Sequence, residues 1–155
     1  MSVTAEKIMA APVITVSPEA TLEEAIKILA KNDISGLPVV DAQNKLVGII
    51  SEKDIIEYTN TLHVVSLLGT SGWISPHTDV SDIAAFKKGA ELLSTTSVEK
   101  VMSKKVVTAT RQTTSAELAK LMRKRNVNRL PVVDDDGTVE GIVSRADLLK
   151  SLADQ

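Results

Sequence analysis

The stretch Leu130-Pro-Val-Val-Asp134, followed by a polar turn and by Gly141-Ile-Val-Ser-Arg-Ala-Asp147, decides how this chain is organised. An earlier stretch reads Leu37-Pro-Val-Val-Asp41, a turn, and Gly48-Ile-Ile-Ser-Glu-Lys-Asp54, and each landmark recurs 93 positions later. Placing residues 6–57 over residues 99–150 needs no gap and pairs 18 identical residues among 52, against roughly three expected from average composition. The chain therefore contains a duplicated unit.

The composition indicates a soluble globular protein without covalent crosslinks. The 155 residues are 43% apolar and 25% charged, which is ordinary for a globular domain. The chain has no cysteine, so disulfides, thiolate chemistry and cysteine-based metal sites are excluded. Neither a secretory signal nor an apolar run of about 18 residues is visible. We therefore expect a cytoplasmic protein without a membrane partner.

Each repeated unit has the pattern strand, helix, β-hairpin, helix. Val13–Val16 is a short β-branched run between two prolines and is predicted to be a strand. Thr21 and Glu24 have the spacing of a capping box, and apolar residues at helical spacing then predict a helix that ends at Asn32-Asp33. The other predicted elements are strands Leu37–Val40 and Leu46–Ile50, a helix from Ser51, a strand Val106–Ala109, a helix from the capping box Thr114/Glu117 to Arg125, strands Leu130–Val133 and Val139–Val143, and a helix from Ser144.

The fold class that follows is α/β (α+β), with two β-α-β-β-α units packed pseudo-symmetrically. One unit has a three-stranded sheet that it cannot cover alone, and two copies can bury these faces against each other. We place the first unit at residues 1–57 and the second at residues 98–155. Residues 58–97 have no counterpart and form a mainly helical insert, with helices expected at Leu62–Leu68 and from Asp79 or Ser81 to Leu93, which we expect to pack against the units.

The repeated Gly-x-x-Ser-x-x-Asp pattern has two interpretations. In the structural one, Ser51 and Ser144 are helix N-caps, and Asp54 and Asp147 complete capping boxes at the third helical position. In the functional one, the helix N-terminus attracts an anion, the Ser hydroxyl donates to a phosphate oxygen, and the Asp carboxylate accepts from two ribose hydroxyls. The second interpretation predicts a site for the sugar-phosphate part of a nucleotide.

The repeated motifs resemble a known family. Met9…Val13-Ile-Thr15, Ile34-Ser-Gly-Leu-Pro-Val-Val-Asp41 and Gly48–Asp54, together with Met102…Val106-Val-Thr108, Val127-Asn-Arg-Leu-Pro-Val-Val-Asp134 and Gly141–Asp147, are similar to a tandem pair of cystathionine-β-synthase (CBS) domains, a Bateman module. The resemblance covers about 104 of the 155 residues and leaves the insert unexplained. It implies a regulatory sensor that binds AMP, ADP or ATP in one or two clefts between the units, and that forms a homodimer through its helices. S-adenosylmethionine or NAD would use the same ribose contacts.

The resemblance also implies which residues bind the nucleotide. Ribose and phosphate would be held by the repeated Ser and Asp residues, and adenine would meet backbone and methyl groups of the first strand of each unit. Phosphate contacts would come from basic residues just before the Leu-Pro step and beside the Ser. The residues so assigned are Ile14, Thr15, Ser51, Lys53, Asp54, Val107, Thr108, Arg129, Pro131, Ser144, Arg145 and Asp147. Gly36 and Glu52 stand where the second unit has Arg129 and Arg145, so the second unit is the better phosphate binder by charge.

Other functions stay open at this point. A ligand-free dimerisation module would leave both clefts empty, and an enzyme would have its site in the insert around Trp73, His77 and Asp79. The basic residues between Lys120 and Arg129 could contact DNA, although a net charge of −2 argues against a nucleic-acid partner. His63 and His77 have no partner pattern for a metal or a catalytic triad, and Asp134–Asp136 is most simply a hairpin turn. We therefore expect no catalysis, no metal and no required cofactor, and a regulated partner that is a separate protein.

Overall fold

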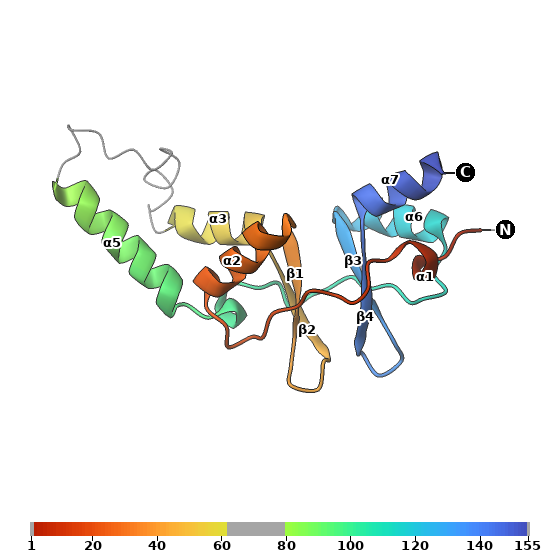
Figure 1. The fold of residues 1–155 in the computed structure, drawn as a ribbon, viewed down its shortest axis with the longest axis horizontal. Coiled ribbons are helices and arrows are strands. Elements are labelled where there is room, and N and C mark those ends of the chain that lie inside the picture. Colours follow the sequence, from red (N-terminus) through yellow and green to blue (C-terminus); the bar gives the residue numbers. More distant parts are fainter. Residues whose placement is uncertain (1, 62–79, 155) are drawn as a thin grey trace.

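Two α+β units lie side by side in the structure, each a β-hairpin with two helices packed against it (Figure 1). This computed structural model describes residues 2–61 and 80–154. The first unit contains α2 (Leu22–Asn32), β1 (Gly36–Val40), β2 (Leu46–Ser51) and α3 (Glu52–Thr61), and the second contains α6 (Ser115–Arg125), β3 (Arg129–Val133), β4 (Val139–Ser144) and α7 (Arg145–Ala153). Three further elements are α1 (Ala5–Ile8), α5 (Val80–Thr95) and the short 3₁₀ helix η1 (Val98–Lys100).

The helices α2 and α6 begin and end where the sequence predicts. The Thr21 and Thr114 hydroxyls accept from the backbone N–H of Glu24 and Glu117 at 3.1 and 3.3 Å, and each Glu carboxylate accepts from the Thr N–H at 2.8 Å. Both capping boxes are therefore confirmed. Each helix ends at a left-handed residue, Asp33 at φ 50° or Asn126 at φ 53°.

The two hairpins have the same register and the same irregularity. Residues Gly36–Val40 pair with Leu46–Ser51, and the ladder shifts between Val39 and Val40; the second hairpin shifts at the equivalent step. Each turn is closed by an aspartate side chain that accepts two backbone N–H groups. Asp134 Oδ1 takes those of Asp136 and Thr138, both at 2.9 Å. The acidic run at 134–136 is therefore a hairpin turn, as the sequence predicts.

The strands predicted at Val13–Val16 and Val106–Ala109 are wrong. Each is reduced to one parallel bridge, Val16 to Val39 and Ala109 to Val132, so the sheets have two strands and not three. A parallel ladder would continue through a bond from the N–H of residue 38 to the carbonyl of Ile14. Residue 38 is proline, which has no N–H, and Pro131 has the same effect in the second unit. The segments before the bridges consequently keep their backbone groups out of the sheet.

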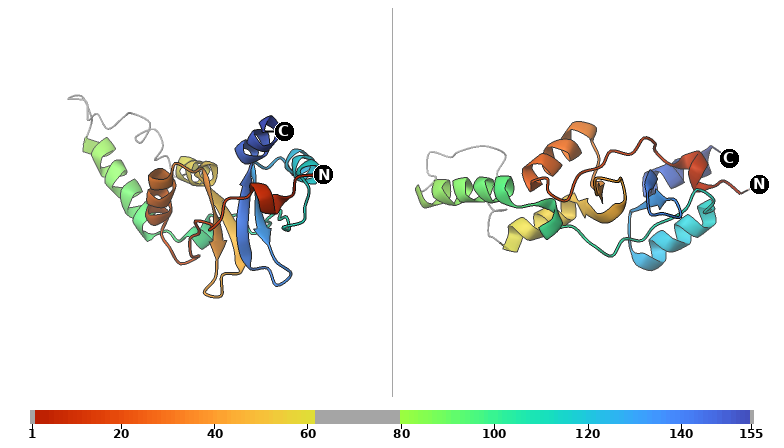
Figure 2. Two further views of the ribbon diagram at one scale, coloured as in Figure 1. Left: turned by 45° about the vertical axis from the view of Figure 1, so that its right-hand side comes forward. Right: turned by 90° about the horizontal axis from the view of Figure 1, so that it is seen from below.

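The segment that precedes each unit packs on the other unit. Ala10 exchanges backbone hydrogen bonds of 2.9 and 3.2 Å with Ile142 in β4, and Ser103 does the same with Ile49 in β2 at 2.9 and 3.0 Å. Ala5 in α1 is fully buried in the second core, whereas Val98 in η1 is fully buried in the first. Figure 2 shows the N-terminal segment running from α1 on the second unit across to α2 of the first. The division of the sequence into units at residues 1–57 and 98–155 stays a prediction.

Two methionine–glycine contacts hold the exchanged segments in place. The side chain of Met9 lies over Gly141 in β4, and that of Met102 lies over Gly48 in β2. A Cβ at position 141 would be 2.8 Å from the Met9 Cγ, and a Cβ at position 48 would be 3.0 Å from the Met102 Cγ. Glycine at these positions therefore permits the close approach of a segment from the other unit.

The tips of the two hairpins are also joined. The N–H of Leu46 donates to the carbonyl of Gly137 at 3.0 Å, and the N–H of Val139 donates to the carbonyl of Asn44 at 3.1 Å. These bonds are equivalent under the 93-residue offset, so a pseudo-twofold axis passes between the tips. The pseudo-symmetric packing expected from the repeat is therefore present at the tips and at the exchanged segments.

The described part of the insert is helical and packs on the first unit. The helix expected up to Leu93 is confirmed as α5, and Tyr58 and Leu93 pack against the first core. The helix expected at Leu62–Leu68 lies outside the described residues, as do Trp73 and both histidines. No helix in the described part of the chain has the length and hydropathy needed to cross a membrane.

Gly141→Ala should lower the free energy of unfolding by about 1–3 kcal/mol, because the new methyl group overpacks against Met9. Urea unfolding measures this penalty. We expect a smaller penalty when Met9→Ala removes the opposing side chain. Met102→Ala is the matched control, since Met102 contacts Gly48 and not Gly141, and it should leave the penalty unchanged. Equal penalties in all three backgrounds would show that the contact carries no strain.

Candidate functional site

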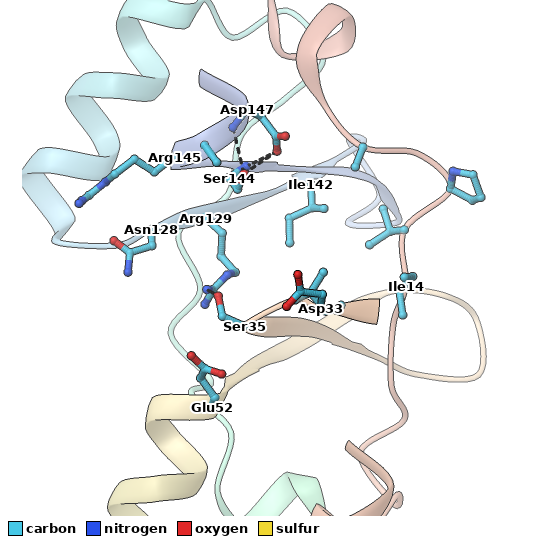
Figure 3. Close-up of a pocket in the computed structure, with 16 residues that line it drawn as sticks. Ile14, Asp33, Ser35, Glu52, Asn128, Arg129, Ile142, Ser144, Arg145 and Asp147 are labelled. Atoms are coloured by element: carbon cyan, nitrogen blue, oxygen red, sulfur yellow. Dashed lines mark hydrogen bonds between the residues drawn. The ribbon is translucent and has the colours of Figure 1, made fainter. Parts of the chain in front are cut away.

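Two clefts lie between the units, and each takes residues from both. The first has a volume of about 560 Å³ and the second about 320 Å³, within the range of small-molecule sites. The first combines Ile14 of the leading segment with Ser144, Arg145 and Asp147 (Figure 3). The second cleft combines the equivalent residue Val107 with Ser51, Lys53 and Asp54. Each cleft thus joins the first segment of one unit to the helix N-terminus of the other.

The repeated Ser and Asp residues form capping boxes at the mouths of both clefts. In the first cleft, Asp147 Oδ2 accepts from the Ser144 N–H at 2.8 Å and from its hydroxyl at 2.7 Å, and the Asp147 N–H donates to Ser144 Oγ at 3.1 Å. Ser51 and Asp54 repeat these bonds at 2.9, 2.9 and 3.2 Å. The structural interpretation of the pattern is therefore confirmed.

The capping bonds leave one oxygen of each carboxylate available. Both bonds to Asp147 and both bonds to Asp54 use Oδ2, and Oδ1 of each has no hydrogen-bond partner among the described residues. The Ser hydroxyls, in contrast, already donate to the Asp and accept from its N–H. A ligand hydroxyl can therefore donate to Oδ1 without disturbing the cap, whereas a phosphate would have to replace a Ser–Asp bond.

The leading segments bring free backbone groups to the clefts. Ile14 is 41% exposed and lines the first cleft, and its N–H and carbonyl have no backbone partner in the described part of the chain. Val107 has the same position in the second cleft. Pro38 and Pro131 account for the free carbonyls, because neither proline has an N–H to donate to the facing segment. Of the remaining sequence-predicted residues, Thr15, Thr108 and Pro131 line neither cleft, and Pro131 is fully buried in β3.

Arg129 is the basic residue common to both clefts. Its side chain extends from β3 toward the first unit, where Nη2 donates to the hydroxyl of Ser35 (Figure 3). Burial lowers the pKa of the Arg129 guanidinium, and the carboxylates of Glu52 and Asp54 oppose this effect by raising it. No carboxylate lies within ion-pair distance of Arg129 among the described residues. Arg145 lines only the first cleft and Lys53 only the second.

Several lining residues were missed by sequence reasoning. Ser35 and Asn128 are equivalent positions two residues before the Leu-Pro step, and both line both clefts. Their place in the loop between helix and strand was the available signal, since such loops often carry binding residues. Asp33, Ile142 and Lys105 also line one cleft each, and nothing in their sequence pattern distinguishes them. Within residues 2–61 and 80–154 no three acidic or histidine side chains are grouped as metal ligands.

Comparisons with known proteins agree with the duplicated architecture. The family model described as CBS domain matches residues 5–60 and 98–154. The protein MJ1426 of Methanocaldococcus jannaschii is 38% identical over 149 residues, which are 94% of this chain and 88% of that protein.

Two solved structures have the same fold. The CBS domain pair of protein MJ0100, in complex with 5′-methylthioadenosine and S-adenosyl-L-methionine, is 27% identical and superposes with a TM-score of 0.74, covering 99% of this chain and 98% of that one. CBSX2 of Arabidopsis thaliana is 22% identical and superposes with a TM-score of 0.75, covering 99% and 96%. The chain therefore belongs to the CBS-domain family, with two matches to the family model that form one pair.

Proposed function

We propose that this protein is a regulatory module that binds AMP, ADP or ATP in one or both clefts. The single observation that carries the proposal is that each cleft contains both an unused carboxylate oxygen and the half-buried guanidinium of Arg129. A carboxylate that accepts from vicinal hydroxyls suits a ribose, and a guanidinium without a carboxylate partner suits a phosphate.

The geometry supports a role for each wall of the cleft. Adenine would lie against Ile14 in the first cleft or Val107 in the second and exchange hydrogen bonds with their free backbone groups. Ribose hydroxyls would donate to Oδ1 of Asp147 or Asp54. Phosphate would be met by Arg129, with Arg145 in the first cleft or Lys53 in the second.

The ligand of a related pair supports the adenosine part of the proposal. The MJ0100 pair was solved with two adenosine-containing molecules, 5′-methylthioadenosine and S-adenosyl-L-methionine. The cationic residues in the clefts of this chain favour a phosphorylated ligand over these. S-adenosylmethionine and NAD remain the alternatives, because both contain the same ribose.

Ligand binding would act by changing how the two units sit together. Every cleft has walls from both units, so a ligand that fits one arrangement better than another shifts the population toward it. The regulated protein would be a separate partner that recognises this change in arrangement. In this proposal the chain acts by binding, without catalysis of its own and without a required cofactor.

Exposed apolar residues support a homodimer formed through the helices. Ile56 in α3 is 51% exposed, and Leu149 and Leu152 in α7 are 62% and 55% exposed. Ile56 and Leu149 are equivalent positions 93 residues apart, so the two units present matching apolar faces. Such a face is suited to an isologous contact with a second copy.

A melting screen should show stabilisation by AMP, ADP or ATP. A ligand at a hundredfold excess over its Kd raises the free energy of unfolding by about 2.7 kcal/mol. S-adenosylmethionine should have a smaller effect at the same concentration, because it has no phosphate to place against Arg129. A ligand-free dimerisation module would show no shift with any of the four compounds.

Asp147→Ala should weaken AMP binding in the first cleft by roughly tenfold to a hundredfold, because a hydrogen bond to a charged group contributes about 1.5–3 kcal/mol. Isothermal titration calorimetry measures this change. Glu117→Ala is the matched control, since it removes the carboxylate of a capping box that lines neither cleft. Equal affinity in Asp147→Ala and the unaltered protein would refute the ribose role.

Leu149→Glu should convert the dimer to a monomer, because two carboxylates would be buried against each other across the twofold contact. Sedimentation velocity measures the change. Ala42→Glu is the control, since Ala42 is exposed in the turn between β1 and β2. Figure 1 shows this turn at the end of the hairpin away from the helices. Unchanged sedimentation of the Leu149 variant would exclude α7 as the contact.

A further inference from the structure

The two clefts have a common wall at the pseudo-twofold axis. Four residues line both of them, namely Ser35, Glu52, Asn128 and Arg129. Arg129 is the one cation in this wall. Whatever enters either cleft therefore meets the same guanidinium, whereas the other basic residues, Arg145, Lys53 and Lys105, line one cleft each.

The guanidinium of Arg129 occupies the space beside position 36. Gly36 is the residue equivalent to Arg129, and the guanidinium lies directly against it. A Cβ at position 36 would be 2.6 Å from the Arg129 Cζ and 2.8 Å from its Nε. Near a twofold axis, equivalent positions face each other, and two long side chains would compete for the same space. The duplicated chain has glycine in one unit and arginine in the other, so a single guanidinium occupies this space.

Arg129 also has no ion-pair partner in the described part of the chain, although the carboxylates of Glu52 and Asp54 act on its charge. Its partner in the described residues is the neutral hydroxyl of Ser35, which belongs to the first unit. Burial lowers the pKa of the guanidinium, so its charged form would gain from an anion on either side. A phosphate in one cleft would draw the guanidinium toward it and away from the other cleft.

We propose that Arg129 couples the two clefts negatively, so that a phosphate bound in one weakens the binding of a phosphate in the other. This inference rests on the nucleotide-binding function proposed above. The cause is competition for one guanidinium, joined by repulsion between two phosphates that approach it from opposite sides. An adenosine ligand without phosphate makes no demand on Arg129, so its two binding events should be independent.

Titration calorimetry with AMP tests the coupling. Asp147→Ala weakens AMP binding in the first cleft and Asp54→Ala weakens it in the second, so the stronger association constant of each variant is the single-cleft constant of the cleft that was not altered. If the clefts are independent, the product of the two association constants of the unaltered protein equals the product of the single-cleft constants. We expect it to fall at least about fivefold below, the lower end of ordinary coupling between sites. One AMP per unaltered chain, with one AMP in each variant, would be the extreme form of the same result.

Three controls separate Arg129 from other causes. For adenosine, the product of the two association constants of the unaltered protein should equal the product of the single-cleft constants. This control needs no substitution at Arg129. Arg129→Gln should weaken AMP binding in both clefts and make the two products of association constants equal. Arg145→Gln should weaken only the first cleft and retain the coupling.

The outcomes distinguish this inference from the function on which it rests. Equal products with AMP in the unaltered protein would overturn the coupling and leave nucleotide binding standing. Coupling that persists in Arg129→Gln, or that appears equally with adenosine, would remove Arg129 as its cause. Absence of binding by AMP and adenosine alike would overturn the proposed function and the inference together.

Discussion

The structure depends on the reciprocal exchange of the segments that precede the two units. Residues around Met9 complete the second unit, and residues around Met102 complete the first, through backbone pairs with β4 and β2. Arg111 strengthens the first of these contacts, since it donates to Glu6 at 2.9 Å and to Glu140 at 2.8 Å. Neither unit has its full core without the other, so the position of each cleft is fixed by the same contacts that complete the fold.

The local structure could be predicted because its causes are local in the sequence. The boxes at Thr21/Glu24 and Thr114/Glu117 depend on residues three apart, and the hairpin turns depend on one aspartate and its next four residues. Repetition at a constant offset strengthened each assignment. The fold class and the family followed from these patterns, and both were confirmed.

What could not be predicted depends on contacts between distant residues. The β-branched residues of Val13–Val16 favour a strand. Whether this segment pairs in a sheet depends on the facing residue Pro38, whose missing N–H ends the ladder. The recurring Met and Gly residues are the one sequence feature that reflects the exchange of leading segments. The sequence does not show that these residues contact each other across the two units. Likewise, Arg129 was identified as a phosphate residue, but its place in the wall of both clefts follows from the pseudo-twofold axis.

The two interpretations of the Ser and Asp pattern are compatible because a carboxylate has two oxygens. One oxygen of Asp54 and of Asp147 holds the helix N-terminus, and this bond fixes the direction of the other. The cap thus pre-orients the group proposed to bind ribose, which reduces the entropy lost when a ligand arrives.

The contact between Gly36 and Arg129 also bears on why the two units share one polypeptide. Two identical half-length chains that associated around the same axis would have the same residue at both positions, either two glycines with no charge or two arginines competing for the space that one guanidinium fills here. Covalent fusion lets the two positions differ. A single off-axis cation is therefore a feature that only a tandem chain of this kind can have, and a symmetric assembly of separate units cannot reproduce it.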